Sequence, residues 1–290
     1  MERVKKTTVL RRMLEEKGII VMPHAYDCLS AKLIEQAGFR VVGLTGAGIS
    51  ASLLGVPDVG LATMTEVVNH ARNIVKSTSL PIVADCDTGY GNPINVMRTI
   101  TEFEDAGVAG IFFEDQLSPK KCGHFEGKML IRKEEMLKKI EAALEARKDP
   151  DLVIIARTDA RSVNGLEDAL DRAKAYAEAG ADMIFVESPY SVDEIREIAN
   201  KIQKPQMINI VEGGKTPILS VGELESLGIK LASFSGTLQK TAIKAMQRVL
   251  RVLRETGSVE GVLDHIVSLE ERSMILGLDK VYELEKRFKV

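Results

Sequence analysis

The sequence predicts an α/β protein built as a (β/α)8 barrel, also called a TIM barrel, with extra helices at its C-terminus. Short, continuous apolar runs alternate with helical stretches eight times along the 290 residues. Apolar runs without polar alternation are typical of parallel strands whose two faces are both covered. Eight such strand–helix units favour a closed barrel. A doubly wound open sheet is the alternative, but no G-x-G-x-x-G motif follows the first strand.

The elements can be assigned in order along the chain. A short amphipathic helix over 8–17 precedes the first strand, over 19–22, which we expect Pro23 to close. The strands are predicted over 19–22, 41–45, 81–85, 110–113, 152–157, 183–187, 206–210 and 231–234, and the helices over 28–37, 65–77, 94–106, 133–147, 166–179, 192–202 and 221–227. Glycines such as Gly38 stop the helices because they tolerate the left-handed conformation.

The chain continues past the eighth strand with two further predicted helices, over 237–255 and 268–288. This is more helix than a closed barrel needs. No interior linker is rich in Pro, Gly or Ser, so we expect one barrel domain over 1–290, with 238–290 as a C-terminal helical extension. We expect the surplus helices to pack on a neighbouring subunit.

The composition excludes several classes of protein. Hydrophobic residues make up 45% of the chain and charged residues 28%, which is typical of a globular protein. The formal net charge is −3 and no strongly basic block is present, so nucleic acid and anionic membranes are not expected partners. No apolar run is long enough to cross a bilayer. Cys28, Cys86 and Cys122 form no disulfide framework or CxxC motif, which favours the cytoplasm.

Acidic residues collect where the predicted strands end. Asp85, Asp87 and Glu114 follow neighbouring strands, and Asp58 lies in the loop after the second strand. In such barrels the C-terminal strand ends carry the reactive residues. Clustered carboxylates repel one another unless a cation lies between them, and oxygen ligands suit Mg²⁺. A single acid here would more simply be a helix N-cap, but several together predict a metal site.

Other polar groups follow the same strand ends. Arg157 closes an apolar strand, and a buried arginine needs an anion, either Glu187 or a substrate carboxylate held in a bidentate fork. The turn at 45–48, Thr-Gly-Ala-Gly, offers N–H groups and a hydroxyl that suit a second carboxylate, although a plain tight turn has the same composition. His24 and His70 are expected to be structural or to face solvent.

The loop at 113–128 contains the sequence Lys-Lys-Cys-Gly-His at 120–124. Neighbouring cations are expected to lower the pKa of the Cys122 thiol. A loop of this kind can close over a site and open again. A solvated lysine turn with an incidental cysteine is the alternative.

Three motifs together resemble the isocitrate lyase / phosphoenolpyruvate mutase superfamily. They lie at 85–91 (Asp-Cys-Asp-Thr-Gly-Tyr-Gly), 114–116 (Glu-Asp-Gln) and 120–124. The likeness runs from Leu10 to about Thr237. The cysteine loop is similar to the catalytic loop of the carbon–carbon lyase branch, which includes 2-methylisocitrate lyase and the 2-alkylmalate lyases. The resemblance implies a barrel whose last helix is exchanged between subunits, a homotetramer, and Mg²⁺ or Mn²⁺ as cofactor.

The resemblance also implies a role for each matching residue. Asp85 would bind the metal directly, with Asp58, Asp87 and Glu114 acting through metal-bound water. The substrate would be bound by Thr45, Gly46, Ala47, Gly123, Arg157 and Asn209. The catalytic set would be Cys122, Lys120, His124, Arg157 and Glu187, with Cys122 as the acid.

The implied reaction is a Mg²⁺-dependent cleavage of 2-methylisocitrate or a related 2-alkylmalate to pyruvate, or another 2-keto acid, and a carboxylic acid. The metal lowers the pKa of the substrate hydroxyl, and a thiol protonates the departing carbanion. Gly43 stands where methylisocitrate lyases carry a tyrosine, and residues 233–237 lack their arginine. A dicarboxylate and a tricarboxylate substrate therefore both stay open.

Two other functions compete with the lyase. One is an oxaloacetate decarboxylase or phosphonopyruvate-type enzyme on the same barrel, against which the cysteine loop counts. The other is a keto-acid-binding protein without catalysis, against which the full set of acids and metal ligands counts.

Overall fold

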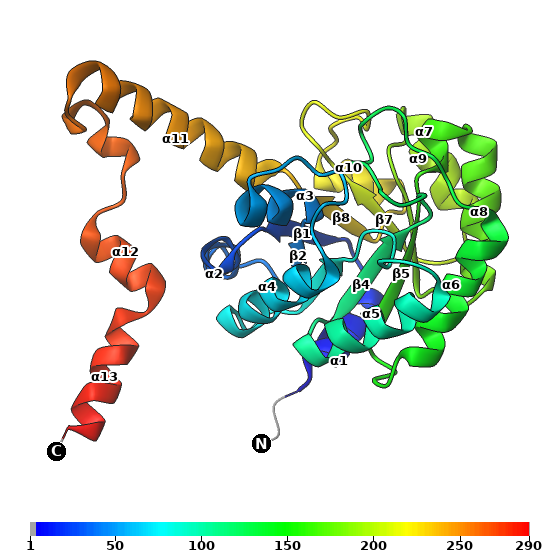
Figure 1. The fold of residues 1–290 in the computed structure, drawn as a ribbon, viewed down its shortest axis with the longest axis horizontal. Coiled ribbons are helices and arrows are strands. Elements are labelled where there is room, and N and C mark those ends of the chain that lie inside the picture. Colours follow the sequence, from blue (N-terminus) through cyan, green and yellow to red (C-terminus); the bar gives the residue numbers. More distant parts are fainter. Residues whose placement is uncertain (1–3, 290) are drawn as a thin grey trace. The chain divides into compact units, whose positions relative to one another are not determined.

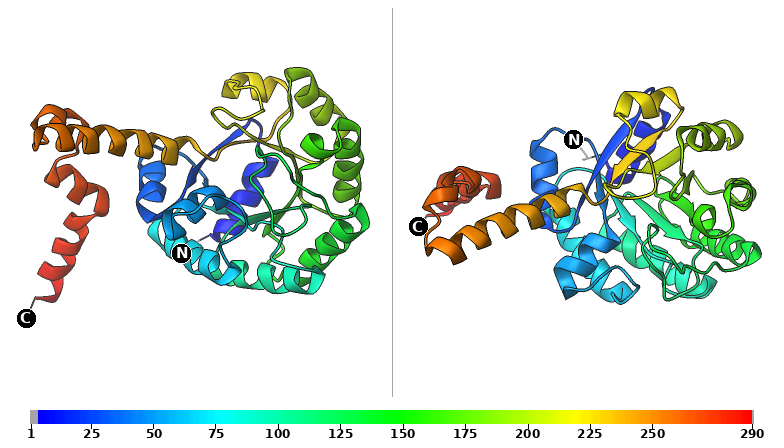
Figure 2. Two further views of the ribbon diagram at one scale, coloured as in Figure 1. Left: turned by 45° about the horizontal axis from the view of Figure 1, so that its top comes forward. Right: turned by 90° about the horizontal axis from the view of Figure 1, so that it is seen from above.

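The computed structural model describes residues 4–289 and contains a closed barrel of eight parallel strands in sequence order. Each strand pairs with the next one, and β1 closes the ring by pairing with β8. Helices surround the strands (Figures 1 and 2). The predicted (β/α)8 barrel is confirmed, whereas the exchange of a helix between subunits stays a prediction.

Every strand and helix predicted for the barrel is present, with bounds shifted by a few residues. The strands are β1 (Ile20–Ala25), β2 (Val42–Leu44), β3 (Ile82–Asp85), β4 (Gly110–Glu114), β5 (Val153–Thr158), β6 (Met183–Val186), β7 (Gln206–Asn209) and β8 (Leu231–Phe234). The helices are α1 (Lys6–Glu15), α2 (Cys28–Gln36), α3 (Gly46–Ile49), the π-helix η1 (Ser50–Leu54), α4 (Met64–Ser77), α5 (Pro93–Ala106), α6 (Lys133–Ala146), α7 (Ala160–Val163), α8 (Leu166–Glu178), α9 (Val192–Lys201) and α10 (Val221–Ser226).

Local capping residues explain why the helices begin and end where they do. In α5 the side chain of Asn92 accepts hydrogen bonds from the N–H groups of Ile94 and Asn95, at 3.0 and 3.2 Å. Pro93 occupies the first helical position, where its missing N–H costs nothing. Gly107 ends the helix with φ of 89°, a conformation that suits glycine.

Helix α1 covers the N-terminal end of the barrel. Its buried residues Leu10 and Met13 pack with Val83, Val153 and Phe185 in the apolar cluster that fills the barrel interior. One face of this short amphipathic helix therefore closes the interior from below, and the opposite, C-terminal mouth is left for polar groups.

Two local predictions at the barrel strands are wrong. Pro23 does not close β1, which continues to Ala25. Pro23 lies at the end of the pairing with β8, and His24 and Ala25 then pair with β2, so the missing proline N–H disturbs little. The expected turn at 45–48 is the start of the one-turn helix α3, because the Thr45 side chain caps it by accepting from Gly48 N at 3.2 Å.

The chain divides into two compact units, residues up to Thr237 and residues from Leu238 onward. The second unit contains α11 (Thr237–Thr256), the 3₁₀ helix η2 (Glu260–His265), α12 (Leu269–Leu276) and α13 (Leu278–Phe288). A single helix over 268–288 was predicted and is wrong, because Gly277 adopts φ of 78° and separates α12 from α13. None of the described residues in α11, α12 and α13 is buried.

Among the described residues, every helix is too short or too polar to span a membrane.

Candidate active site

The site is built by the alternation of side chains along the strands. Successive side chains of a strand point to opposite faces, so a residue two positions after an interior residue also points inward. The interior apolar cluster contains Met22, Val41, Val83, Phe112, Ile155, Phe185, Met207 and Leu231. Two positions later the strands carry His24, Gly43, Asp85, Glu114, Arg157, Glu187, Asn209 and Ser233. A polar layer therefore lies directly above the apolar core, at the C-terminal mouth.

The Lys120 ammonium lies between two of the predicted acids. Its Nζ is 2.5 Å from Asp58 Oδ1 and 2.9 Å from Asp87 Oδ1. Burial opposes the charge of Lys120, but Asp87, Asp58 and Asp85 outweigh it and raise its pKa well above the usual value. Burial, with Asp85 and Asp58, raises the pKa of Asp87 to about 6, although Lys120 offsets part of the effect. The structure thus brings the predicted Lys120 and the acids together.

The oxygen atoms of the acids suit a hard cation. Asp85 accepts hydrogen bonds from Gly46 N at 3.2 Å and from Asp87 N at 3.0 Å. A Cβ at Gly46 would lie 2.8 Å from Asp85 Oδ2, so glycine lets the backbone approach this carboxylate. Glu114 Oε2 is buried and has no hydrogen-bond partner among the described residues. Burial raises the pKa of Glu114 well above its usual value, against the effect of Arg157 and Lys120. This orphaned oxygen and the all-oxygen donor set fit Mg²⁺.

The acids do not form a ready-made cage for a metal. Within the described part of the chain, no three His, Cys, Asp or Glu side chains converge closely enough to hold an ion together. Mg²⁺ keeps several waters and takes one or two carboxylates directly, so one direct ligand with acids reaching through water agrees with this arrangement. Direct metal binding by Asp85, and binding through water by the other acids, stays a prediction.

Arg157 has the expected partner Glu187 and a second, closer one. Its Nε and Nη2 donate to Asp159 at 2.9 and 3.1 Å, whereas Nη2 lies 3.5 Å from Glu187 Oε2. The bidentate fork is therefore made with Asp159, which was not predicted, while the expected ion pair with Glu187 is also present. The guanidinium also stacks over the Phe185 ring, 5.2 Å from its centroid. Arg157 stays buried and charged because two carboxylates surround it.

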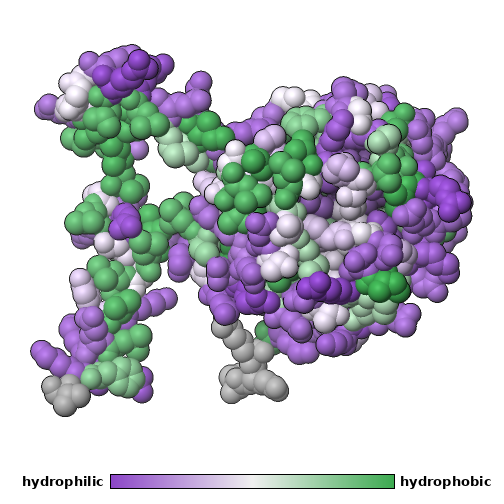
Figure 3. Space-filling view, in the orientation of Figure 1, coloured by the Kyte–Doolittle hydropathy of each residue, from purple (hydrophilic) through white to green (hydrophobic). Residues whose placement is uncertain are grey.

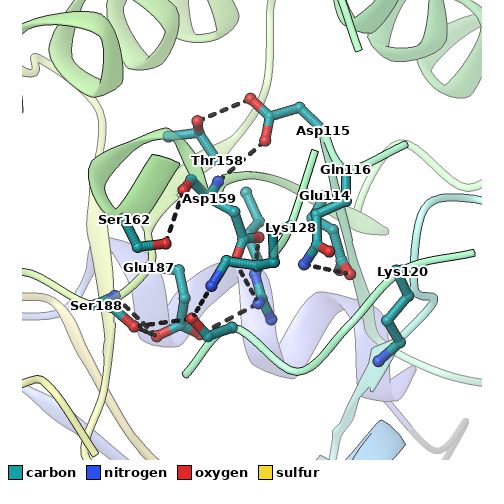
Figure 4. A network of polar contacts seen from close by, with 12 residues as sticks. Glu114, Asp115, Gln116, Lys120, Lys128, Thr158, Asp159, Ser162, Glu187 and Ser188 are labelled. Carbon is teal, nitrogen blue, oxygen red and sulfur yellow. Dashed lines mark hydrogen bonds and ion pairs between the residues drawn. The ribbon is translucent and has the colours of Figure 1, made fainter. Parts of the chain in front are cut away.

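Asp115 fixes the segment that holds Arg157. It follows Glu114, so its side chain points away from the interior and accepts from Thr158 Oγ1 at 2.8 Å and from Asp159 N at 3.0 Å. Tyr176 and Arg172 of α8 also donate to Asp115, at 2.8 and 3.2 Å. Figure 4 shows the bonds of Asp115 to Thr158 and Asp159, between the ends of β4 and β5. The fully satisfied carboxylate anchors Asp159, and Asp159 orients Arg157.

The cysteine loop is packed down on the mouth. Gln116 holds it by exchanging two hydrogen bonds with the Lys121 backbone, at 2.8 and 2.9 Å. The buried Lys128 amine, labelled in Figure 4, donates to Gly123 O at 2.5 Å and to Phe125 O at 2.7 Å. A Cβ at Gly123 would lie 2.6 Å from Arg157 Nη2 and from Glu187 Cγ, so only glycine allows this approach. The loop therefore covers Arg157 and Glu187 directly.

The Cys122 thiol does not have the lowered pKa that was expected. Burial raises its pKa, and Asp58 and Glu187 add to the effect, while the His124 backbone and Arg157 oppose it. The cations of the loop are used elsewhere, Lys120 by the acids and Lys128 by backbone carbonyls. Cys122 is therefore a protonated thiol at neutral pH, which is the form that a proton donor needs.

His124 is held in one orientation. Its Nδ1 accepts from Lys215 N at 3.2 Å and lies 3.3 Å from Ser188 Oγ. The ring proton therefore lies on Nε2, which is 3.6 Å from Glu187 Oε1. Burial lowers the pKa of His124, with Glu187 opposing the shift. Glu187 itself is fixed by the backbone N–H of Ser188 at 2.8 Å.

The polar groups of Thr45, Gly46 and Ala47, predicted to bind a substrate carboxylate, are partly occupied by hydrogen bonds within the protein. Gly46 N donates to Asp85, and Thr45 Oγ1 accepts from Gly48 N. Asn209 lies in the inward layer, where its Oδ1 accepts from Ser233 Oγ at 3.3 Å. These residues all surround the mouth, and their contact with a substrate stays a prediction.

The sequence reasoning missed His24 and Ser233. His24 is buried in the inward layer, so of the two expected alternatives the solvent-facing one is wrong and the structural one is not contradicted. Its Nε2 lies 2.7 Å from Ser233 Oγ, and Nδ1 makes no hydrogen bond within the described residues although it lies near the Leu44 backbone. Burial lowers the pKa of His24 to about 3. Its position two residues after the interior Met22 was the signal that could have found it.

The chain resembles known proteins along nearly its whole length. Residues 10–254 match the family described as phosphoenolpyruvate phosphomutase. The chain is 46% identical over 279 residues to the 2,3-dimethylmalate lyase of Eubacterium barkeri, covering 96% of both proteins. It is 43% identical to the 2-methylisocitrate lyase of Aeropyrum pernix, covering 96% of this chain and 89% of that protein. A solved structure of oxaloacetate acetylhydrolase with 3,3-difluorooxalacetate has a TM-score of 0.92 at 34% identity, covering 97% of this chain and 96% of that one.

Replacing His24 by glutamine is expected to reduce the acid sensitivity of folding. Folded His24 binds a proton only near pH 3, whereas the unfolded residue does so near 6.5. The stability of a fold that keeps His24 neutral is therefore fully present above pH 6.5 and is lost as the pH falls toward 3. Relative to His24→Gln, the free energy of unfolding of the wild type should fall by up to about 1.4 kcal/mol per pH unit in that window. Denaturant unfolding at several pH values measures this, and parallel curves for the two proteins would contradict it.

Proposed function

The chain belongs to the phosphoenolpyruvate mutase family, in its 2-methylisocitrate lyase-like branch, and is a carbon–carbon lyase. We propose that it is a Mg²⁺-dependent enzyme that cleaves 2-methylisocitrate or a related 2-alkylmalate. The products would be pyruvate, or another 2-keto acid, and a carboxylic acid.

The observation that carries this proposal is the position of the Cys122 loop. Gly123 lies against Arg157 and Glu187, and Cys122 N donates to Asp58 O at 3.1 Å, so the loop carries Cys122 between the arginine side and the acid side of the mouth. The thiol is protonated because burial raises its pKa. Decarboxylation also leaves a carbanion, but as the enolate of the keto acid, which water can protonate. Lyase cleavage instead leaves the carbanion on the carboxylic-acid half, where an acid placed over the mouth can protonate it.

Each residue has a physical task in this reaction. Arg157 would bind the carboxylate of the keto-acid half, with Asp159 and Glu187 holding the guanidinium in place. Lys120 would balance the charge of Asp58 and Asp87, and His124 would present its Nε2–H beside Glu187. Thr45, Gly46, Ala47 and Asn209 would line the remaining wall. Cys122 Sγ–H would give its proton to the departing carbon as the loop excludes water.

We propose Mg²⁺, with Mn²⁺ as a substitute, as the cofactor of this reaction. Asp85 would hold it directly, and Asp58, Asp87 and Glu114 through water. When bound, the ion would supply Lewis-acid stabilisation of negative charge on the 2-hydroxy-acid end of the substrate. The orphaned Glu114 Oε2 and the close approach of Gly46 to Asp85 support this assignment.

We also propose a cytoplasmic homotetramer. The three cysteines are free, which suits a reducing compartment. The helices α11, α12 and α13 bury none of their described residues, and Leu250, Leu269 and Met274 are all more than half exposed. Figure 3 shows apolar side chains along this unit. Apolar surface on this scale marks a protein interface, and a second copy of the chain is the partner that the family implies.

Replacing Cys122 by serine should lower turnover while leaving substrate binding intact. A hydroxyl is a much weaker acid than a thiol, and loss of general acid catalysis costs about 10²–10⁴-fold. Pyruvate release from 2-methylisocitrate, 2,3-dimethylmalate and oxaloacetate, each with Mg²⁺, measures the effect. Cys28→Ser is the control, because Cys28 begins α2 on the outer ring. Undiminished lyase turnover in Cys122→Ser would refute the role of Cys122 as the acid, and decarboxylation of oxaloacetate alone would favour the decarboxylase instead.

Removal of metal should abolish cleavage, and added Mg²⁺ or Mn²⁺ should restore it. Asp85→Asn removes the proposed direct ligand and should raise the Mg²⁺ concentration needed for half-maximal rate. Asp105→Asn, at an exposed acid of α5, is the control and should leave the metal titration unchanged. Full turnover in excess chelator would refute the metal assignment.

Light scattering at micromolar concentration should show four chains per particle. Leu250→Ser weakens the exposed apolar face of α11 and should shift the population toward smaller species. The neighbouring exposed residue provides a matched control, Arg251→Ser, which should remain tetrameric. A monodisperse monomer of the wild type would refute the assembly.

A further inference from the structure

We propose that His24, together with Ser233 and Gly43, forms a neutral specificity subsite that selects an uncharged substituent on the substrate. The subsite would favour a dicarboxylate of the 2,3-dimethylmalate type over a tricarboxylate. This inference rests on the proposed lyase function and names the part of the chain that decides between its two candidate substrates.

The charges of the inward layer are unevenly distributed around the barrel. Asp85, Glu114, Arg157 and Glu187 come from β3 to β6. The inward positions of the four strands that complete the ring are Asn209, Ser233, His24 and Gly43. None of these four carries a charge, since burial keeps the His24 imidazole neutral above about pH 3. A substrate group on this side of the mouth therefore meets no cation from the strands.

The shape of this side is set by His24. A Cβ at Gly43 would lie 2.2 Å from His24 Nε2, 2.3 Å from Cδ2 and 2.6 Å from Cε1. The imidazole thus fills the volume that any side chain at position 43 would need. Gly43 on β2 leaves the space that the His24 ring from β1 occupies. The ring therefore forms the wall of the inward layer at this point.

A hydrogen-bonded row keeps the ring in place. His24 Nε2 is 2.7 Å from Ser233 Oγ, and Ser233 Oγ is 3.3 Å from Asn209 Oδ1. All three side chains are buried or nearly so. The row links the neutral wall to Asn209, which the proposed function places in substrate binding.

The two candidate substrates differ at one position next to the bond that breaks. 2,3-Dimethylmalate carries a methyl group on C3, and 2-methylisocitrate carries a carboxymethyl group there. Removing an extra carboxylate from water without a counter-charge is costly, whereas a methyl group gains from a dry wall. If C3 faces the His24 side, the neutral subsite favours the methyl group.

The test compares the efficiencies (kcat/KM) for these two substrates in the wild type and in a matched pair of variants. The wild type should prefer 2,3-dimethylmalate by about tenfold or more. His24→Gln keeps a neutral side chain of similar reach and should preserve that ratio within about threefold. His24→Lys is one bond longer than His24→Gln and adds a cation, and should shift the ratio toward 2-methylisocitrate by about tenfold or more.

Two outcomes would overturn the subsite. One is that the wild type cleaves 2-methylisocitrate at least as efficiently as 2,3-dimethylmalate. This outcome can be measured even if neither variant folds. The other is that both variants change kcat/KM for the two substrates by the same factor, which is the result expected if His24 has a purely structural role.

Calorimetric binding of both substrates to Cys122→Ser in the presence of Mg²⁺ separates this inference from the function it rests on. If the wild type releases pyruvate from neither substrate, the lyase proposal fails. A tighter Kd for 2,3-dimethylmalate would still support the subsite, and equal or reversed Kd values would refute it.

Discussion

Closure of the barrel is the constraint on which the rest of this structure depends. Eight parallel strands around a small interior force side chains into layers, because every second residue of every strand points to the same central axis. Phe112 and Ile155 fill the lower layer, and Glu114 and Arg157, two residues further on, fill the upper one. Helix α1 closes the lower end with Leu10. Polar groups can therefore gather only at the opposite mouth, where water and ligands reach them.

The mouth is stabilised by balancing charges that are individually costly to bury. Lys120 lies between Asp58 and Asp87, and Arg157 lies between Asp159 and Glu187. Removing one partner of such a set leaves an uncompensated buried charge. The cysteine loop contributes Lys120 to this balance, so the packed position of the loop and the neutralisation of the acids depend on each other. The loop also holds a protonated thiol at the same place, because burial raises the pKa of Cys122.

Much of the candidate site could be predicted from the sequence, and the omissions have physical causes. The acids and Arg157 were found because each follows an apolar strand. Asp159 was missed as the partner of Arg157 because its position depends on Asp115, forty-four residues away along the chain. The direction of the Cys122 pKa shift was wrong because cations adjacent in sequence point to other partners in space. The boundary within 268–288 was missed because Gly277 was treated as a helical residue.

The sequence by itself determined the barrel, its strand order and the residues at its mouth, because apolar periodicity and the polar residues after each strand are local properties of the chain. Only the tertiary structure decided which of those residues touch one another. His24 shows the difference: its spacing from Met22 places it in the inward layer, but its contacts are with Gly43 and Ser233 on two other strands, and through Ser233 with Asn209 on a third. Contacts across the interior, and the pKa shifts that burial produces there, arise only when the ring closes.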